Sequence, residues 1–436
     1  MTRFRRSCGL LVGVLAFVTA VSGCGGDTGS SQSSNASSSS GPVTLTWWHN
    51  ANTDPGLSFW QSVADDFHKA HPNITVKVVP TQNEQLQTKI PVALQSSDPP
   101  DVYQQWGGGA LATQVAAGKV LDITNDVKPW IGQLSTAVGN WQVNGKQYGI
   151  PYNLGVVGFW YNKDLFTKAS ISSPPATWDD FLADVGKLKA AGIVPISVGG
   201  QDRWPDAFYW DYLAVRMCSK SVIQQAAKTY NLSDQCWTQA GQKVQQLLDA
   251  KPFQPGYLAT PAQVGAGSAA GLMGNGKAAM ELQGQWDVGV MNSLTPNGQG
   301  LADKLGWFAF PSVSGGKGAQ TAALGGGDGF SCSWKAPRQA CVQFLQWMSS
   351  PDVQKRWTAL NVGLPTNTAA TGSVADVNLK NLITVRNKVP YVQLYLDIAF
   401  STAVGQALDD ATANQFAGTT TPQQVVKAIT DAAANQ

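Results

Sequence analysis

Residues 43–80 read VTLTWWHNANTDPGLSFWQSVADDFHKAHPNITVKVVP, and this stretch indicates the fold class. Its first six residues alternate and are rich in β-branched side chains, which is typical of a strand. Residues 53–72 predict a helix, because Asp54 can cap it and apolar residues repeat along one face. Residues 73–80 then predict a second strand, with Ile74, Val76 and Val78 on one side.

The same alternation of strand and helix continues along the chain. Residues 83–106 predict a helix, a proline stop and a short strand, so the first three strands should form a parallel sheet covered by helices. Trp47 is assigned to the core, since strand alternation turns Trp48 to the opposite side. Further strand patterns and helix patterns follow, with one helix expected over 340–357 and a helical C-terminus from Tyr391.

The composition bounds the architecture and the partners. A chain of 436 residues exceeds a typical single core, so two lobes are expected. The formal net charge is +2, but three arginines stand in the first 23 residues, which hold no acidic residue. The remainder is therefore near neutral and offers no charged surface for nucleic acid or for an acidic membrane. Sixteen tryptophans are unusual, and indole rings serve cores and binding surfaces alike.

The N-terminal segment predicts export and anchoring. Arg3, Arg5 and Arg6 precede the apolar run 10–20, which is too short to span a bilayer comfortably. VSGC at 21–24 resembles the lipobox of bacterial lipoproteins, which implies a signal peptide over 1–23 and lipidation of Cys24. The Gly- and Ser-rich residues 24–42 should then form a flexible tether. The paired arginines leave the export route, Sec or Tat, open.

Four further cysteines are expected to be oxidised outside the cytoplasm. Cys218, Cys236, Cys332 and Cys341 allow three pairings, and nearness in sequence favours Cys218–Cys236 and Cys332–Cys341. A metal site is the alternative, but neither a CxxC spacing nor a nearby histidine supports it.

Enzyme motifs are weak in this chain. His68 and His71 lack a third metal ligand nearby, Ser268 lacks the glycine two residues before it, and the glycines near Gly274 lack a phosphate-loop spacing. Asp179 and Asp180 begin a predicted helix, where they complement its dipole. A carboxylate pair of the glycosidase kind cannot be judged from sequence, so that alternative stays open.

Five short segments that combine polar and aromatic residues, here called bursts, are more informative than these enzyme motifs. They are WWHNAN at 47–52, QQWGGG at 104–109, QDRWPDAFYW at 201–210, LQGQWD at 282–287 and GGGDGF at 325–330. Most of them end predicted strands, where open α/β sheets bind ligands. Planar amides and carboxylates can satisfy sugar hydroxyls, and indole faces can pack on sugar C–H groups. The bursts therefore favour a carbohydrate ligand.

Several motifs together resemble one known family. TLTWWHN at 44–50, DVYQQWGGG at 101–109, the stretch 148–166, PPATWDDF at 174–181 and GKAAMELQGQWD at 276–287 are similar to the family 1 extracellular solute-binding proteins. These are carbohydrate-binding lipoproteins of bacterial ABC importers, with maltose-binding protein as the best-known member. The resemblance covers nearly all of the chain after the tether, and the motifs stand in the same order.

The resemblance implies an α/β fold of the two-lobe periplasmic-binding-protein class (type II), with discontinuous lobes joined by a hinge. Lobe 1 would hold 43–152 and 325–368, and lobe 2 would hold 153–324 and 369–436. Residues 151–154 and 324–327 would cross between the lobes, and the ligand would lie between the lobes.

The resemblance also implies a set of ligand-binding residues. They come from the bursts and from the predicted crossing strands: His49, Asn50, Asn52, Gln105, Trp106, Gly107, Tyr152, Asn153, Asp202, Trp204, Asp206, Gln283, Trp286 and Asp328. Residues 105–108, Gln-Trp-Gly-Gly, replace the acidic, basic-flanked loop of maltose-binding protein. That departure argues against maltose specificity. The stretch is instead similar to that of actinobacterial binders of β-linked disaccharides, for which xylobiose is the first candidate ligand and cellobiose or chitobiose the next.

We expect the protein to be an extracellular, lipid-anchored receptor of a Gram-positive bacterium, of the actinobacterial kind. It would capture an oligosaccharide and deliver it to the transmembrane subunits of an ABC permease, as a monomer without cofactor, metal, nucleic acid or catalysis. One alternative is a secreted glycosidase that uses Glu281, Asp287 or Asp328. Another is a receptor for a charged ligand, such as a polyamine or peptide, which needs like charges that the amide-rich bursts do not show.

Overall fold

The computed structural model describes residues 41–435, and Pro42–Gln436 form one compact unit. The predicted signal peptide over 1–23, the lipidated Cys24 and all but the last two residues of the tether lie outside the described residues. Within the described residues, no helix combines the length and the apolar character that a bilayer crossing requires.

The first sheet has six strands in the order β12-β11-β3-β1-β2, with β6 also paired to β11. Its strands are β1 Val43–His49, β2 Ile74–Pro80, β3 Val102–Gln105, β6 Ile150–Val156, β11 Ala323–Cys332 and β12 Val392–Leu394. Strands β2 and β3 lie parallel to β1, which confirms the predicted parallel arrangement. Strand β11 runs antiparallel to β3 and to β6, so the sheet is mixed.

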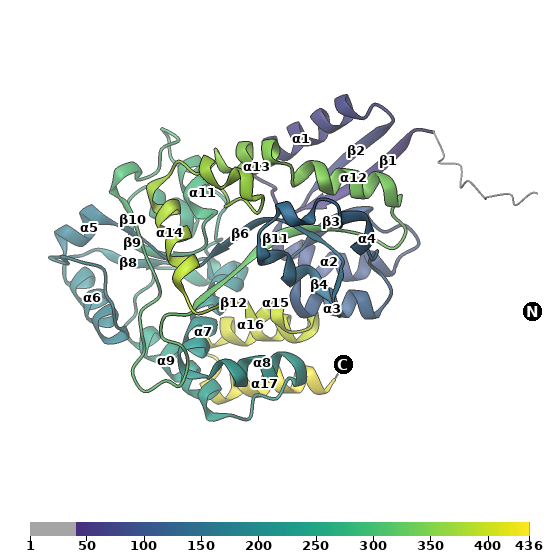
Figure 1. Ribbon diagram of the computed structural model, residues 1–436. Coiled ribbons are helices and arrows are strands. Elements are labelled where there is room, and N and C mark those ends of the chain that lie inside the picture. Colours follow the sequence, from purple (N-terminus) through teal and green to yellow (C-terminus); the bar gives the residue numbers. More distant parts are fainter. Residues whose placement is uncertain (1–40, 436) are drawn as a thin grey trace, which may run out of the picture. The chain divides into compact units, whose positions relative to one another are not determined.

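The second sheet has four strands in the order β10-β7-β9-β8, and it lies on the opposite side of the unit from β1 and β2 (Figure 1). Its strands are β7 Gly158–Asn162, β8 Val194–Ser197, β9 Ala278–Gln283 and β10 Leu305–Phe308. A small hairpin pairs β4 Gln142–Val143 with β5 Lys146–Gln147. Strands β6 and β7 are consecutive in the chain, so the first sheet leads directly into the second.

Helices cover both sheets (Figure 1). The α-helices are α1 Gly56–Ala70, α2 Asn83–Gln95, α3 Gly108–Ala116, α4 Thr124–Val127, α5 Lys163–Lys168, α6 Trp178–Ala190, α7 Trp204–Met217, α8 Lys220–Thr229, α9 Gln235–Asp249, α10 Ala269–Gly274, α11 Asp287–Ser293, α12 Arg338–Met348, α13 Pro351–Thr358, α14 Val377–Lys388, α15 Leu396–Ala399, α16 Thr402–Phe416 and α17 Pro422–Ala434. Short 3₁₀ turns are η1 Ile131–Gln133, η2 Thr136–Trp141, η3 Gly200–Asp202, η4 Tyr257–Ala259, η5 Ala302–Lys304 and η6 Thr368–Ser373.

Helix α1 forms largely as its sequence predicts. The carboxylate of Asp54 accepts the backbone N–H of Ser58 at 3.0 Å and so satisfies a donor of the first turn, although the helix begins two residues later than Asp54. Its buried face includes Trp60, Val63 and Phe67, as the apolar spacing predicts.

Two sequence predictions on the C-terminal side are wrong in detail. The single helix expected over 340–357 is two helices, because Ser350 accepts the N–H of Val353 and Pro351 supplies a first-turn residue, and both are helix-start signals. The segment after Tyr391 is not helical throughout, since β12 pairs in parallel with the first residues of β11. A three-residue strand is too short to show a clear alternation in sequence.

Trp47 lies in the core of the first sheet, which confirms its assignment. The side chain is 0% exposed, and its ring makes edge-to-face contacts with Trp60, Phe330 and Phe344 at centroid distances of 5.0–5.5 Å. These contacts join β1, α1, β11 and α12, so Trp47 ties together elements that lie far apart in sequence.

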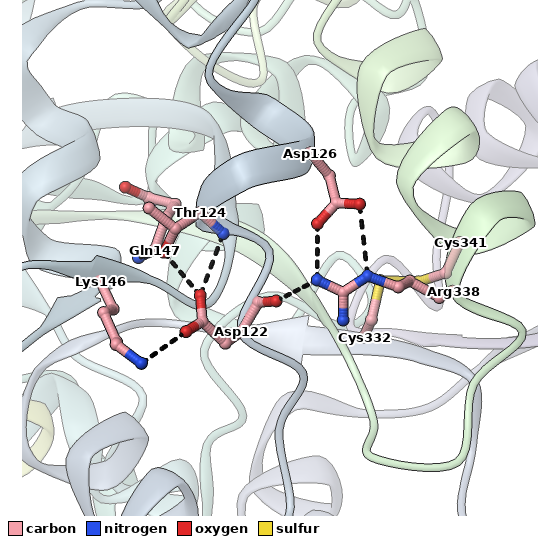
Figure 2. Close-up of polar contacts among 8 residues, drawn as sticks. All are labelled: Asp122, Thr124, Asp126, Lys146, Gln147, Cys332, Arg338 and Cys341. Carbon is pink, nitrogen blue, oxygen red and sulfur yellow. Dashed lines mark hydrogen bonds and ion pairs between the residues drawn. A yellow bond between two sulfur atoms is a disulfide. The ribbon is translucent and has the colours of Figure 1, made fainter. Parts of the chain in front are cut away.

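Two disulfides close short loops, with the pairing that sequence proximity favours: Cys218–Cys236 and Cys332–Cys341. The second lies beside a polar cluster that attaches the start of α12 to α4 (Figure 2). There Arg338 donates to the carboxylate of Asp126 and to the backbone oxygen of Asp122. Asp122 in turn binds Lys146 at 2.9 Å, so the disulfide and the ion pairs hold one corner of the first sheet.

We predict that Trp47→Ala lowers the free energy of unfolding by about 3–5 kcal/mol, the usual cost of removing a fully buried indole. Urea unfolding followed by circular dichroism measures this change. The matched control is Trp334→Ala, which removes an indole that is 39% exposed and should cost less than about 1 kcal/mol. Equal losses in the two variants would contradict the assignment of Trp47 to the core.

Candidate ligand-binding site

A cavity of about 190 Å³ opens beside the carboxyl ends of β1 and β3, the bulged centre of β11 and the start of α7. The residues that line it are Asn50, Ala51, Asn52, Thr53, Asp54, Pro55, Gly56, Gln82, Asn83, Glu84, Gln87, Trp106, Tyr152, Asn153, Asp202, Trp204, Phe208, Ala262, Gln263, Val264, Trp286, Val290, Gly327, Asp328, Trp357, Val362, Tyr395, Asp397 and Ile398.

Asp328 is the central acceptor of the cavity wall. Its carboxylate accepts the side-chain amides of Gln104 at 2.9 Å and Asn153 at 3.0 Å, and Asn50 lies at 3.5 Å. The register of β11 against β6 shifts between Asp328 and Gly329, and such a bulge re-aims a side chain out of the regular pleat. Burial raises the pKa of Asp328, while the hydrogen bonds from these amides and from Trp106 oppose that rise.

Asn153 carries the network toward the second sheet. Its side-chain oxygen accepts the amide of Gln285 at 3.1 Å and the backbone N–H of Leu364 at 2.9 Å. A chain of hydrogen bonds therefore runs from Gln104 through Asp328 and Asn153 to the loop after β9. This chain orders planar groups from four separate segments around one end of the cavity.

Aromatic rings form another wall. Trp204 lies edge-to-face with Trp286 at a centroid distance of 6.3 Å and with Phe208 at 5.2 Å. Phe208 stacks on Tyr395 at 5.1 Å. Trp106, Trp204 and Trp286 are each partly buried against the core, so a free part of each ring can face a ligand.

Glu84 and Trp204 meet across the cavity. The indole N–H of Trp204 donates to one carboxylate oxygen of Glu84 at 2.7 Å, and the other oxygen is buried without a hydrogen-bond partner among the described residues. Burial raises the pKa of Glu84, and the nearby charge of Asp202 raises it further. Burial likewise raises the pKa of Asp202, although its carboxylate accepts the backbone N–H of Ala262 at 2.8 Å.

Nine of the fourteen ligand-binding residues predicted from sequence line this cavity: Asn50, Asn52, Trp106, Tyr152, Asn153, Asp202, Trp204, Trp286 and Asp328. The structure thus brings together residues from every one of the five bursts. Whether each contacts a ligand stays a prediction.

Gln105 and Gly107 do not line this cavity. The Gln105 side chain donates to Gln114 at 2.8 Å and accepts the N–H of Gly107 at 3.0 Å, so its hydrogen bonds hold the turn after β3. Gly107 has φ of 82°, and a Cβ there would stand 2.3 Å from the backbone oxygen of Asn140. Gln105 reaches only a neighbouring cavity of about 40 Å³.

His49, Asp206 and Gln283 are buried and do not line the cavity. The Nδ1 atom of His49 accepts the N–H of Ala51 at 3.2 Å, and burial lowers its pKa to about 3. Neither oxygen of Asp206 has a hydrogen-bond partner among the described residues, and burial raises its pKa well above the usual range.

Sequence reasoning missed Glu84, Asn83 and Gln87, which α2 presents to the cavity, and Asp397 at the start of α15. No polar and aromatic burst marks these residues, because they belong to ordinary helical turns. The signal in the sequence was only the amide-rich stretch 82–87 with its one acid, Glu84, which also suits a solvated helix start.

The residues considered for other chemistry have structural partners. Ser268 is fully buried and caps α10 through the N–H of Gly271, and His68 Nδ1 lies 2.8 Å from the backbone oxygen of Ile74. Thr177 caps α6 at Asp180. Among the described residues, no group of three or more His, Cys, Asp or Glu is placed to hold a metal ion.

Comparisons with known proteins agree with this architecture. The chain is 28% identical over 306 residues to an uncharacterised ABC transporter extracellular-binding protein of Pyrococcus horikoshii, covering 67% of this chain and 68% of that one. It is 24% identical over 321 residues to a multiple sugar-binding protein of Streptococcus mutans, covering 68% and 69%. A solved structure from work on xylan utilisation by Caldanaerobius polysaccharolyticus superposes with a TM-score of 0.80 at 26% identity, covering 89% and 99%.

The superposition confirms the predicted fold class, the two-lobed α/β fold of periplasmic binding proteins. A family model described as bacterial extracellular solute-binding protein matches residues 50–355, which is more than half of the chain. This chain therefore belongs to the family of bacterial extracellular solute-binding proteins.

Proposed function

We propose that this protein is the extracellular substrate-binding lipoprotein of an ABC sugar importer, which captures an oligosaccharide and delivers it to the permease. The observation that carries the proposal is the cavity of about 190 Å³, in which four tryptophans stand among amides and carboxylates. Membership of the solute-binding family supports a receptor, and the lining supports a sugar as its cargo.

The lining supplies both kinds of contact that a sugar needs. Each hydroxyl both donates and accepts hydrogen bonds, and the amides of Asn50, Asn52 and Gln87 offer donors and acceptors in fixed planes. The C–H face of a pyranose is apolar and packs on an indole such as Trp204 or Trp286. Since the network at Asp328 already orders its amides, little conformational entropy is lost when a sugar binds.

A β-linked disaccharide fits the available support best, with xylobiose the first choice among uncharged sugars. The QQWGGG motif at 104–109 favours this class, and it places Trp106 in the cavity wall. The relative from a study of xylan utilisation is 26% identical, and the relative from Streptococcus mutans is a multiple sugar-binding protein.

The mechanism we propose is hinge closure of two lobes, 43–152 with 325–368 and 153–324 with 369–436. The hinge would lie at 151–154 and 324–327, where β6 and β11 pair and lead from one sheet toward the other. The hydrogen bond from Trp204 to Glu84 would join the two lobes. A sugar that contacts both lobes makes all of its contacts only in the closed state, so its binding free energy favours closure.

The remaining parts of the proposal concern location and partners. A lipid on Cys24 and a tether to residue 42 would hold the receptor at the outer face of the cell membrane. The permease would recognise the closed monomer, so no reaction and no cofactor are required.

A secreted hydrolase is the alternative, and two of the three acids that the sequence suggests for it are Glu281 and Asp287. Both are buried and adjacent, burial raises the pKa of each, and that of Asp287 is raised to about 7. Neither residue lines the cavity, so a sugar held there cannot reach them. Asp328 does line it, but three amides occupy its oxygens. These positions support binding without hydrolysis.

Calorimetric titration with xylobiose, cellobiose, chitobiose and maltose tests the proposal, with chromatography of each mixture afterwards. We expect xylobiose to bind at least about tenfold tighter than maltose, a difference of about 1.4 kcal/mol, and to be recovered intact. Cleavage of any sugar would establish the hydrolase instead, and no binding of any sugar would contradict the proposal.

We predict that Trp204→Ala weakens disaccharide binding by about thirtyfold, or about 2 kcal/mol, because it removes a ring face and the bond to Glu84. The same calorimetry measures the loss. Trp334→Ala, which removes an exposed indole outside the cavity, should bind as the unaltered protein does. Unchanged affinity in the Trp204 variant would count against the aromatic wall.

The Glu281–Asp287 pair predicts a pH dependence of stability. Because burial raises both pKa values in the folded state, the folded protein holds protons that the unfolded chain releases above about pH 4. The free energy of unfolding should therefore fall as pH rises from 5 to 8, and Glu281→Gln should reduce that slope without changing sugar affinity. Urea unfolding at several pH values measures the slope, and an unchanged slope in this variant would refute the assignment.

A further inference from the structure

The charged side chains that line the cavity have one sign. Five acids line it, Asp54, Glu84, Asp202, Asp328 and Asp397, whereas no lysine, arginine or histidine stands among its described lining residues. The five bursts are rich in amides and by themselves show no cluster of like charges. Glu84 of α2 and Asp397 of α15, which lie outside the bursts, add two acids to the wall.

The protein itself satisfies two of these carboxylates. Asp54 accepts two hydrogen bonds from Ser58 at the start of α1, and Asp328 accepts the amides described above. Glu84 has one buried oxygen without a partner, and one oxygen of Asp202 accepts a backbone N–H. Trp204, which donates to Glu84 at 2.7 Å, lies two residues after Asp202, so the two acids line neighbouring parts of the cavity wall, and the charge of Asp202 raises the pKa of Glu84.

An uncharged sugar leaves this repulsion in place. A hydroxyl can donate a hydrogen bond to each carboxylate, but it cannot neutralise two like charges that burial has already destabilised. An ammonium group between Glu84 and Asp202 would donate to both and cancel their repulsion. Charge-assisted hydrogen bonds of this kind are roughly twice as strong as neutral ones.

Two independent features of the same cavity also suit a cationic sugar. The faces of Trp204 and Trp286 attract cations as well as sugar C–H groups. Tyr395 is only 8% exposed, lines the cavity, and has a hydroxyl with no hydrogen-bond partner among the described residues. A ligand with further polar groups would satisfy that hydroxyl.

We propose that the preferred ligand is an amino sugar, a β-linked disaccharide whose protonated amine lies between Glu84 and Asp202. This inference rests on the proposed function, and it narrows the sugar class beyond uncharged disaccharides. The acidic lining correspondingly excludes sugars that carry carboxylates.

Three disaccharides with one backbone test the inference: β-1,4-linked glucosamine disaccharide, its N,N′-diacetyl form and cellobiose. They differ at carbon 2, which carries an ammonium group, an acetamide or a hydroxyl. Titration at pH 6.5 keeps an amine whose pKa is near 8 protonated. We expect the diamine to bind at least about tenfold tighter than the other two, and added salt to weaken only the diamine.

Variants identify the residues responsible. Glu84→Gln and Asp202→Asn should each reduce the preference for the diamine over cellobiose by about tenfold. Asp303→Asn removes an exposed acid outside the cavity and should leave the preference unchanged. Spermidine, an amine without a sugar, is the further control and should bind weakly.

The outcomes separate this inference from the proposed function. If cellobiose or the diacetyl form binds as tightly as the diamine, the amino-sugar inference is wrong and the sugar receptor stands. If spermidine binds and no sugar does, both proposals are wrong and the cavity serves a polyamine. A preference for the diamine that is unchanged in both Glu84→Gln and Asp202→Asn would also overturn the assigned position of the amine.

Discussion

The carboxylate of Asp328 is the interaction on which the rest of the site depends. It lies at the bulge of β11, where that strand pairs with β6, and it accepts amides that follow β1 and belong to β3 and β6. A buried carboxylate is costly unless such donors surround it, so the same bonds that stabilise the charge also orient the amides. Asn153 then extends the order to Gln285 and the loop before Trp286. The hydrogen bonds of Asp328 therefore connect the strands of the first sheet and also position the polar groups of the cavity.

Much of this arrangement could be predicted from sequence because it depends on local patterns. The alternation in 43–80 predicts the parallel strands and the buried side of Trp47, and proximity favours the disulfides that form. The bursts at strand ends supply residues that do line the cavity. A polar residue at a strand end can also serve the backbone, as Gln105 does for Gly107, and no pattern in the sequence separates the two uses.

What could not be predicted depends on distant contacts. Glu84 enters the site because α2 faces the start of α7, some 120 residues later, and Asp397 enters because β12 pairs with β11. Both residues alter the charge of the cavity, which changes the class of ligand that it suits. The sequence of α2 predicts a helix, the sequence after Tyr391 does not reveal β12, and neither segment indicates which residues it will face. The net charge of the cavity lining therefore depends on which distant elements the fold brings together, and local sequence patterns do not show it.

We propose that this cavity holds an oligosaccharide between the aromatic wall and the Asp328 network. A crystal structure of the protein grown with the tightest-binding disaccharide tests that claim most directly. We expect one sugar ring against Trp204 or Trp286, with hydroxyls bonded to Asn50 and to the amides that Asp328 orders. A sugar bound elsewhere, with this cavity filled only by water, would contradict it.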